Sequence, residues 1–581
     1  MRSKSGEKNL IKRFVKDFFF KYWKNELLVF ILIIADSIFV LVIPYLNKML
    51  IDNVFTNRQY KYFYIILSSM IVGYLLQLFI RVIKDLIFFK VGEKILVDVR
   101  LNLINHVLNL PASFFSKMTS GQLISRVEND VTVLQQVASS AFMEFIGNII
   151  GLIFVLSIMF YLNIKLTLVS LVIMSMYLIM ANYFGKHTRQ KSKEKLNATS
   201  NNISYLSEVF SNIVTIKLFN REAWAYSKFN LLYNIFYNKS IGLWKFQILN
   251  MNSTFLLSIL ATGALWLIGG QALIQGSITL GSLIAFQSYQ GQLFAPLRLF
   301  SNLNSQIQSA TSALERIYTI LDEKLEEIDI TNSKELKEID GKIEFKNVSF
   351  SYNKSEKVLK NLSFCINPGE LVAFVGQSGC GKSTIFNLLT RLYNPQKGSI
   401  FIDDLDIKNI NLESLRNNIS IIPQEIKLFN MSIYENLKLG NSDTSLESIK
   451  EYAEKVDMNE YIENLPNKYN AILDENGNNL SGGQKKRLGI VRSLLKESKI
   501  LIIDEAMNSL DNYRKDKVKE VIKELRGNCT ILLISHQLKD LKDVDKIFIV
   551  EDGTITDCGE HELLLKHNNV YKELYKKELS Q

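Results

Sequence analysis

A glycine-rich segment, GQSGCGKST at residues 376–384, has the residue types that could hold phosphate groups. It follows the apolar run LVAFV, and its spacing, G-x-x-x-x-G-K-S between a strand and a helix, is the one that a phosphate-binding loop requires. Glycines let backbone N–H groups turn toward a phosphate, and the N-terminus of the next helix favours the anion. We therefore expect Lys382 to reach the β- and γ-phosphates and Ser383 to hold Mg²⁺. The residues expected to bind ATP here are Gly376, Gln377, Ser378, Gly379, Cys380, Gly381, Lys382, Ser383 and Thr384.

A second segment, KILIIDEA at residues 499–506, is an apolar strand that ends in two carboxylates. Asp504 can complete the coordination of Mg²⁺, and Glu505 is placed to polarise an attacking water. Such a strand would be weak evidence without the phosphate-binding loop upstream. Together the two segments predict nucleotide hydrolysis.

The composition of the 581 residues separates into two halves. Long apolar runs fill the first half, whereas the second half is ordinary charged α/β sequence, so disorder and collagen-like fibres are excluded. The net charge of +10 would suit nucleic acid or an anionic membrane surface, and the apolar runs favour the membrane and no nucleic acid partner. All four cysteines lie in the second half without metal-ligand spacing, which is typical of a reduced cytosolic domain.

Six apolar stretches of the first half are long enough to cross a bilayer, which takes about 20 residues. They cover residues 26–46, 62–80, 142–162, 166–184, 255–274 and 280–300. The alternative, six buried helices of a soluble bundle, is disfavoured because stretches such as LLVFILIIADSIFVLVIPYL have no polar face. The long loops between spans two and three and between spans four and five have helical patterns, so we expect them to extend the spans into the cytosol.

The distribution of basic residues predicts the orientation in the cell membrane. Basic residues cluster before the first span, and both long loops are rich in Lys and Arg, which favours the cytoplasmic side for both loops and both termini. Residues 10–24 place Leu10, Phe14, Phe18 and Tyr22 at i, i+4 spacing, which is typical of an amphipathic helix on the inner membrane surface; a plain soluble helix is the alternative. We expect no cleavable signal peptide, because this segment is too charged for a signal core, and no N-terminal protease domain, because the first span begins near residue 26.

The domain boundaries follow from these patterns. We expect a transmembrane domain over residues 1–322, a charged linker over 323–340 and a nucleotide-binding domain over 341–581. The fold class is then an α-helical six-span transmembrane domain followed by an α/β phosphate-loop ATPase domain.

The octapeptide LSGGQKKR at residues 480–487 resembles the signature of ATP-binding cassette (ABC) proteins. The resemblance extends to the family's other motifs and implies roles for single residues. Tyr352 matches the aromatic that stacks on adenine, Gln424 the glutamine that contacts Mg²⁺ and the membrane half, and His536 the switch histidine at the γ-phosphate. The signature residues that the resemblance places on ATP are Ser481, Gly482, Gly483 and Gln484.

The first half is similar to the membrane domain of the six-span exporters of this family. Residues 114–131 resemble the region of their first coupling loop, and residues 209–222 resemble that of the second. The family holds each ATP between the phosphate-binding loop of one ATPase domain and the signature of another, which implies a dimer here. We expect a homodimer rather than a heterodimer because every catalytic position is filled.

The resemblance implies an exporter that works by alternating access, with a membrane-lipid environment and a peptide, drug or lipid as substrate. We rank export of a peptide or an amphipathic small molecule first and a lipid flippase second. A non-transporting ATP-gated regulator or channel would need a broken ATPase site, and an importer would usually carry its two domains on separate chains. High Lys, Asn and Ile usage is typical of an AT-rich bacterial genome.

A few residues depart from the family pattern or lie unexpectedly in a span. Lys485 and Lys486 replace glutamine-rich positions after the signature, and Gln537 follows the switch histidine where arginine is common. Asp36 lies midway along the first span, where a charge costs about 2.5–3.5 kcal/mol on insertion scales. It is either a contact for a basic substrate group or, as we favour, a structural partner of another span. Three glutamines of the sixth span, Gln287, Gln290 and Gln292, could line a cavity or join helices.

Overall fold

The chain forms two compact units in a computed structural model that describes residues 10–136, 142–326, 334–336, 339–352, 357–507, 510–535 and 537–579. The first unit comprises Met1–Leu108 with Ser120–Glu323, and the second comprises Asn109–Thr119 with Lys324–Gln581. The linker over residues 323–340 stays a prediction, because part of it lies outside the described residues.

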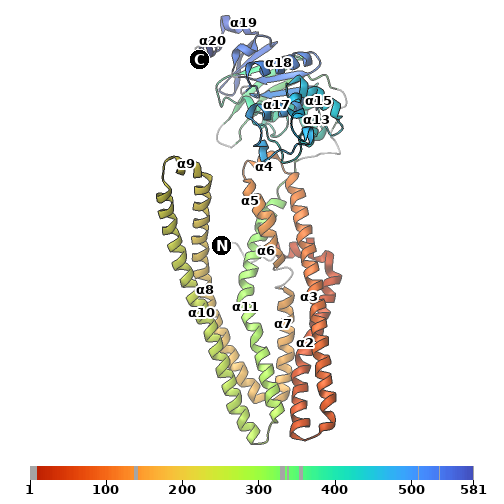
Figure 1. Cartoon of the computed structure of the whole chain (residues 1–581), viewed down its shortest axis with the longest axis vertical. Helices are drawn as coiled ribbons and strands as arrows, with labels where there is room; N and C mark the ends of the chain where they lie inside the picture. Colours follow the sequence, from red (N-terminus) through yellow and green to blue (C-terminus); the bar gives the residue numbers. More distant parts are fainter. Residues whose placement is uncertain are drawn as a thin grey trace. The chain divides into compact units, whose positions relative to one another are not determined.

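Six long helices build the first unit, and each corresponds to one apolar stretch of the sequence (Figure 1). They are α2 (Trp23–Met49), α3 (Phe63–Leu108), α7 (Phe142–Leu162), α8 (Ile164–Ser211), α10 (Glu222–Ile274) and α11 (Leu280–Leu321). Four of the described helical stretches are long and apolar enough to span a membrane, namely Leu10–Thr56, Tyr60–Leu108, Ile164–Ser211 and Glu222–Ile274, and Ile146–Leu162 is a shorter apolar helix.

Short helical segments precede α2 or lie between the long helices. They are η1 (Val15–Phe19), η2 (Phe20–Tyr22), η3 (Leu50–Thr56), η4 (Tyr60–Tyr62), α4 (Ala112–Phe115), α5 (Ser120–Ser125), η5 (Arg126–Asp130), α6 (Val131–Gln136) and α9 (Ile213–Leu218). Helices α8 and α10 run side by side over most of their length and meet at α9, as Figure 1 shows. The long loops between spans two and three and between spans four and five are therefore largely helical continuations of the spans, as their sequence pattern predicts.

The turn before α11 shows how the first unit joins its helices. Thr279 caps α11 by accepting a hydrogen bond from Ser282 N, and its hydroxyl also donates to Asp52 Oδ2 at 2.6 Å. Gly281 N donates to Asp52 Oδ1 at 2.8 Å. A Cβ at Gly281 would lie 2.5 Å from the carbonyl oxygen of Lys48, so only glycine allows this close approach of α11 to the end of α2.

The N-terminal segment is helical, but its apolar stripe packs against the protein itself. Phe14 and Phe18 are buried, with their ring centroids 5.7 Å apart. Lys21 forms an ion pair with Asp98 of α3 at 2.7 Å, and Tyr318 of α11 donates to Asp17. The side chains left exposed for a membrane are therefore others, Phe20 and Trp23 among them.

Asp36 has partners on the neighbouring span. Its carboxylate accepts from Gln77 Nε2 at 3.0 Å and from Lys84 Nζ at 3.2 Å, and the guanidinium of Arg81 lies 3.7 Å away. All three partners belong to α3. The structure therefore supports the structural interpretation of Asp36, because a charge in an apolar span is stabilised when an opposite charge and a hydrogen-bond donor satisfy it.

The glutamines of α11 join helices in the same way. Gln290 is 4% exposed and donates to Ser170 Oγ and to the carbonyl oxygen of Ala261, and Gln292 donates to the carbonyl oxygen of Val40. Each of these acceptors lies on a different long helix. Of the two interpretations of these glutamines, the structure favours helix–helix hydrogen bonding for Gln290 and Gln292.

The second unit contains two sheets. The antiparallel sheet has the order β2-β1-β4-β5 and the larger sheet the order β10-β9-β3-β8-β7-β6, in which all neighbours are parallel except β9 and β10. The strands are β1 (Ile343–Phe350), β2 (Leu359–Ile366), β3 (Leu371–Val375), β4 (Lys397–Ile402), β5 (Leu405–Asp406), β6 (Ile419–Ile422), β7 (Ile500–Asp504), β8 (Thr530–Ile534), β9 (Lys546–Glu551) and β10 (Thr554–Gly559).

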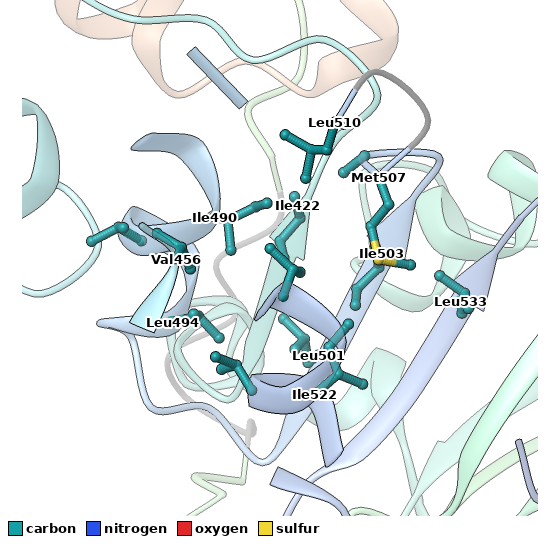
Figure 2. Close-up of a cluster of buried hydrophobic side chains, with 14 of the residues drawn as sticks. Ile422, Val456, Ile490, Leu494, Leu501, Ile503, Met507, Leu510, Ile522 and Leu533 are labelled. Carbon is teal, nitrogen blue, oxygen red and sulfur yellow. The ribbon is translucent and has the colours of Figure 1, made fainter. Parts of the chain in front are cut away.

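The helices of the second unit cover the sheets. They are α12 (Lys382–Leu389), α13 (Leu412–Asn417), α14 (Ile433–Lys438), α15 (Leu446–Lys455), α16 (Asn459–Glu463), α17 (Gly482–Leu494), α18 (Asn512–Leu525), α19 (His561–His567) and α20 (Asn569–Leu579). Figure 2 shows the core between β6–β8 and helices α17 and α18, where Ile490, Leu494 and Ile522 pack on Leu501 and Ile503. A second core lies between the two sheets, where Phe374 and Phe548 stack with centroids 5.3 Å apart. These apolar layers fix the strand ends that carry the site.

We predict that Asp36→Asn lowers the thermal stability of the first unit, by about 1–3 kcal/mol, because the largely shielded Lys84 loses the nearer of its two counter-charges and keeps only Asp85 at 3.8 Å. Thermal unfolding in detergent measures the loss, and all transported substrates should be affected alike. Asp85→Asn is the control, since it removes the more distant partner of Lys84, a side chain that is 67% exposed, and it should cost less stability. Replacing both partners, Asp36→Leu with Lys84→Met, should recover most of the stability. Unchanged stability with selective loss of cationic substrates would instead assign Asp36 to substrate binding.

Candidate nucleotide site

The predicted phosphate-binding loop connects β3 to α12. Lys382, the first residue of α12, is 6% exposed, and its Nζ donates to the carbonyl oxygens of Gly376 and Gln377, both at 2.9 Å. The ammonium thus lies inside the loop. A buried ammonium in a ring of backbone groups at a helix N-terminus is the charge that a nucleotide's phosphates require.

Two glycines make this loop possible. A Cβ at Gly376 would lie 2.1 Å from the carbonyl oxygen of Val550 on β9, so the loop can leave the sheet only without a side chain there. Gly381 has φ +105°, a conformation that side chains rarely adopt, and it turns the chain into α12. The backbone of this loop therefore fits a phosphate group. Ser383, the second residue of α12, is exposed next to the loop.

The strand order of the large sheet brings the segment 499–506, with its two carboxylates, to the edge where the predicted phosphate-binding loop emerges. Strands β3, β8 and β7 are parallel neighbours, so the loop after β3 and the carboxylates after β7 emerge at their common carboxyl end. Asp504 ends β7, and Glu505 follows it with φ +52° and donates its N–H to the carbonyl oxygen of Ile534 on β8. A left-handed conformation at a non-glycine residue costs on the order of 1–3 kcal/mol and is concentrated at functional sites.

Gln424 and Glu505 meet across the sheet edge. Gln424 follows β6, and its Nε2 donates to Glu505 Oε2 at 3.0 Å. The sequence predicted both residues at the site but not this bond between them. The bond holds the carboxylate of Glu505 in one orientation, so a movement of the segment around Gln424 would also move the proposed base.

Tyr352 lies beside α12, the helix that follows the predicted phosphate-binding loop. Its hydroxyl is 3.2 Å from Thr384 Oγ1 and accepts from Asn387 Nδ2 at 3.1 Å, while its ring packs edge-on against Tyr393 at 5.0 Å. The side chain is 46% exposed, which leaves part of the ring free for a base. Tyr393 and Asn387, which the sequence did not single out, hold this ring in place.

The signature segment begins α17. Ser481 caps the helix by accepting from Gln484 N, and Gln484 Oε1 accepts in return from Ser481 N at 2.8 Å, which forms a capping box. Gly482 and Gly483 follow on the exposed turn, and a Cβ at either one would meet nothing within 4 Å. Their backbone angles are ordinary, so neither packing nor conformation within the described chain explains these glycines.

Charged residues behind the signature form a network that the sequence did not reveal. Asp457 accepts from Arg487 of α17 and from Arg514 of α18, and Arg514 also pairs with Asp511 at 3.3 Å. Lys515 contacts both Gln537 and Asp540, and its side chain is 8% exposed. No sequence motif marks Asp457 or Lys515, because their partners lie far along the chain.

Lys486, one of the departures from the family pattern, lies within electrostatic reach of Glu505. Burial lowers the pKa of the Lys486 ammonium below its usual range, and the negative charge of Glu505 opposes that shift. The site therefore carries a cation beside the proposed base. His536 lies outside the described residues, and its role stays a prediction.

Comparisons with known proteins identify the family. One family model, "ABC transporter transmembrane region", matches residues 27–297, and another, "ABC transporter", matches residues 359–508. An ATP-dependent lipid A-core flippase of Desulfotalea psychrophila is 33% identical over 91% of this chain and 93% of its own length. A putative multidrug export ATP-binding/permease protein, YgaD of Bacillus subtilis, is 30% identical over 97% of this chain and 99% of its own length.

A solved structure shares the fold over nearly the whole chain. A bacterial Atm1-family ABC exporter with ATP bound superimposes with a TM-score of 0.82, at 24% identity, over 96% of this chain and 99% of that one. The fold class predicted from the sequence is confirmed.

A helical membrane unit joined to a phosphate-loop ATPase unit defines an ATP-driven membrane transporter. The chain belongs to the ABC transporter family, as a half-transporter of the exporter type in which one membrane domain is fused to one nucleotide-binding domain. It is a multi-pass membrane protein, and the predicted class of enzyme, an ABC-type ATPase coupled to transport, is confirmed.

We predict that Glu505→Gln leaves ATP binding intact and lowers turnover on the order of 10²-fold or more, because an amide cannot accept a proton from water. The amide oxygen still accepts from Gln424, so the geometry should survive. Steady-state hydrolysis and equilibrium binding of a labelled ATP measure the two effects. Turnover close to that of the wild type would show that Glu505 is not the base.

Lys382→Ala should instead weaken nucleotide binding, because the loop loses the charge that offsets the phosphates. Binding of labelled ATP measures the affinity, and thermal unfolding checks that the loop still folds without the Nζ bonds to Gly376 and Gln377. Lys397→Ala, at an exposed position of β4, is the control. Equal ATP affinity in the wild type and Lys382→Ala would contradict the phosphate-loop assignment.

Proposed function

We propose that this half-transporter works as a homodimer that hydrolyses ATP at two composite sites and exports an amphipathic molecule by alternating access. The observation that carries the proposal is the exposed signature turn after the cap Ser481, where Gly482 and Gly483 have no structural explanation within the described chain. Glycines on an open helix N-terminus permit close approach of an anion, such as the phosphates of ATP held by another subunit.

Each composite site would combine residues of two chains. On one chain the phosphate-binding loop, residues 376–384, would hold the phosphates and Tyr352 the adenine. Ser383, Gln424 and Asp504 would hold Mg²⁺, which neutralises charge on the phosphates when bound. Glu505 would take the proton of the attacking water, and His536 would contact the terminal phosphate. The partner chain would contribute Ser481, Gly482, Gly483 and Gln484.

The second cytoplasmic loop supports a dimer as well. Around α9, Phe210, Val214, Leu218 and Phe219 are each about 70% exposed. Large apolar side chains gathered at the end of a cytoplasmic helix pair are a surface that a partner covers. We propose that this loop docks on the second copy and transmits closure of the ATPase units to α8 and α10.

The orientation that fits this function places both termini and both helical loops in the cytosol of a bacterial cell. The basic residues before α2 support it, because such residues favour the cytoplasmic side. The nucleotide-binding unit then lies where ATP is available.

A lipid flippase is the second candidate function, favoured by the similarity to lipid A-core flippases. Reconstitution into vesicles separates the two candidates. ATP-dependent movement of a labelled phospholipid or glycolipid between leaflets would support the flippase, and ATP-dependent accumulation of a peptide or dye in inside-out vesicles would support export of those molecules.

The composite-site model predicts complementation between two inactive variants. Subunits with Ser481→Arg are mixed with subunits carrying Lys382→Ala, so that both lesions fall on one site of the mixed dimer and the other site is intact. We expect ATPase activity to return, up to the level that one site supports. A mixture that stays inactive, although mixed dimers are demonstrated by pull-down with two tags, would exclude the model.

A further inference from the structure

A small apolar pocket lies where the N-terminal helical segment turns into α2. Its volume is about 350 Å³. The apolar side chains that line it come from η1, η2 and the first turns of α2, and they are Val15, Phe19, Phe20, Trp23, Leu27 and Phe30. Phe20, Trp23 and Leu27 are at least half exposed, so the pocket opens to the surroundings of the first span.

One carboxylate lies in this apolar wall. Glu26 lines the pocket and is 7% exposed, and its Oε2 has no hydrogen-bond partner among the described residues. Two cations of the same N-terminal segment, Arg13 and Lys21, pair with Asp322 and Asp98 instead, both at 2.7 Å. A carboxylate oxygen buried without a donor is destabilising unless a ligand satisfies it.

The position of the pocket indicates the class of ligand. Glu26 stands at the start of the first span, and Trp23 beside it is the residue type that concentrates where the headgroups of a bilayer meet its hydrocarbon. Phe20 and Trp23 would contact the first methylenes of an acyl chain. An ammonium group satisfies a carboxylate best at this depth, because it supplies both a positive charge and N–H donors.

We propose that the pocket binds an inner-leaflet phospholipid with a primary ammonium headgroup, such as phosphatidylethanolamine, whose N–H groups donate to the carboxylate of Glu26. A choline headgroup has the same positive charge but no hydrogen-bond donor, and a glycerol headgroup has hydroxyl donors but no positive charge. The site is separate from the nucleotide site, and its assignment does not depend on what the protein transports.

Titration of the full-length protein in detergent with three phospholipids of identical dioleoyl chains tests the proposal. Native mass spectrometry would count the molecules of phosphatidylethanolamine, phosphatidylcholine or phosphatidylglycerol that remain bound. We expect the wild type to prefer phosphatidylethanolamine over phosphatidylcholine by about tenfold at one site per chain, the size of one charge-assisted hydrogen bond. Equal binding of these two lipids by the wild type would overturn the proposal, and this comparison needs no variant.

Two variants assign the preference to the pocket. Glu26→Gln keeps the shape and removes the charge, so the preference should disappear, whereas Glu208→Gln, an exposed carboxylate on α8, should keep it. If Glu26 has only a structural role, Glu26→Gln changes thermal stability equally in all three lipids and the preference persists, which would overturn the proposal. Quenching of Trp23 fluorescence by a brominated phosphatidylethanolamine, compared with Trp23→Phe, provides an independent readout of the location.

Discussion

The parallel alignment of β3, β8 and β7 is the constraint on which the nucleotide site depends. Because these strands run in one direction, the phosphate-binding loop, the end of β8 and the carboxylates after β7 reach the same edge. The apolar core in Figure 2 fixes the strands from one side, with α17 and α18 packed on it. The site is thus a set of strand ends, and its chemistry follows from which residues stand there.

Hydrogen bonds and ion pairs connect the segments that form the site. The bond from Gln424 to Glu505 joins the loop after β6 to the proposed base, and Asp457 joins the signature helix α17 to Arg514 and thereby to Asp511. Lys515 contacts Gln537, the neighbour of His536. The first link joins two residues proposed to meet nucleotide, and the other two join segments at the site to charged residues of α18, so a displacement of one of these segments would affect its partner.

The membrane unit follows a different constraint, because hydrocarbon offers no partner for a polar group. Its polar side chains therefore join helices to each other. Asp36 binds Gln77 and Lys84, Gln290 binds Ser170, and Asp52 binds Thr279. Glu26 differs from these residues, because its Oε2 is buried without a hydrogen-bond partner among the described residues and it lines an apolar pocket at the start of the first span.

The sequence by itself determined the six apolar helices, the phosphate-binding loop and the carboxylates after β7. These features are local: a bilayer sets the length of a helix, and a phosphate loop needs glycines at fixed spacing between a strand and a helix. Only the tertiary structure decided which side chains meet. Gln424 and Glu505 are 81 positions apart, and Asp36 and Lys84 are 48 apart. The apolar stripe of the N-terminal helix predicted a face on the inner membrane surface, whereas Phe14 and Phe18 of that stripe are buried by the protein itself. A periodic pattern shows which face of a helix or strand is apolar. Which residues pack on that face depends on how the elements pack together, and this cannot be read from the local spacing of residues.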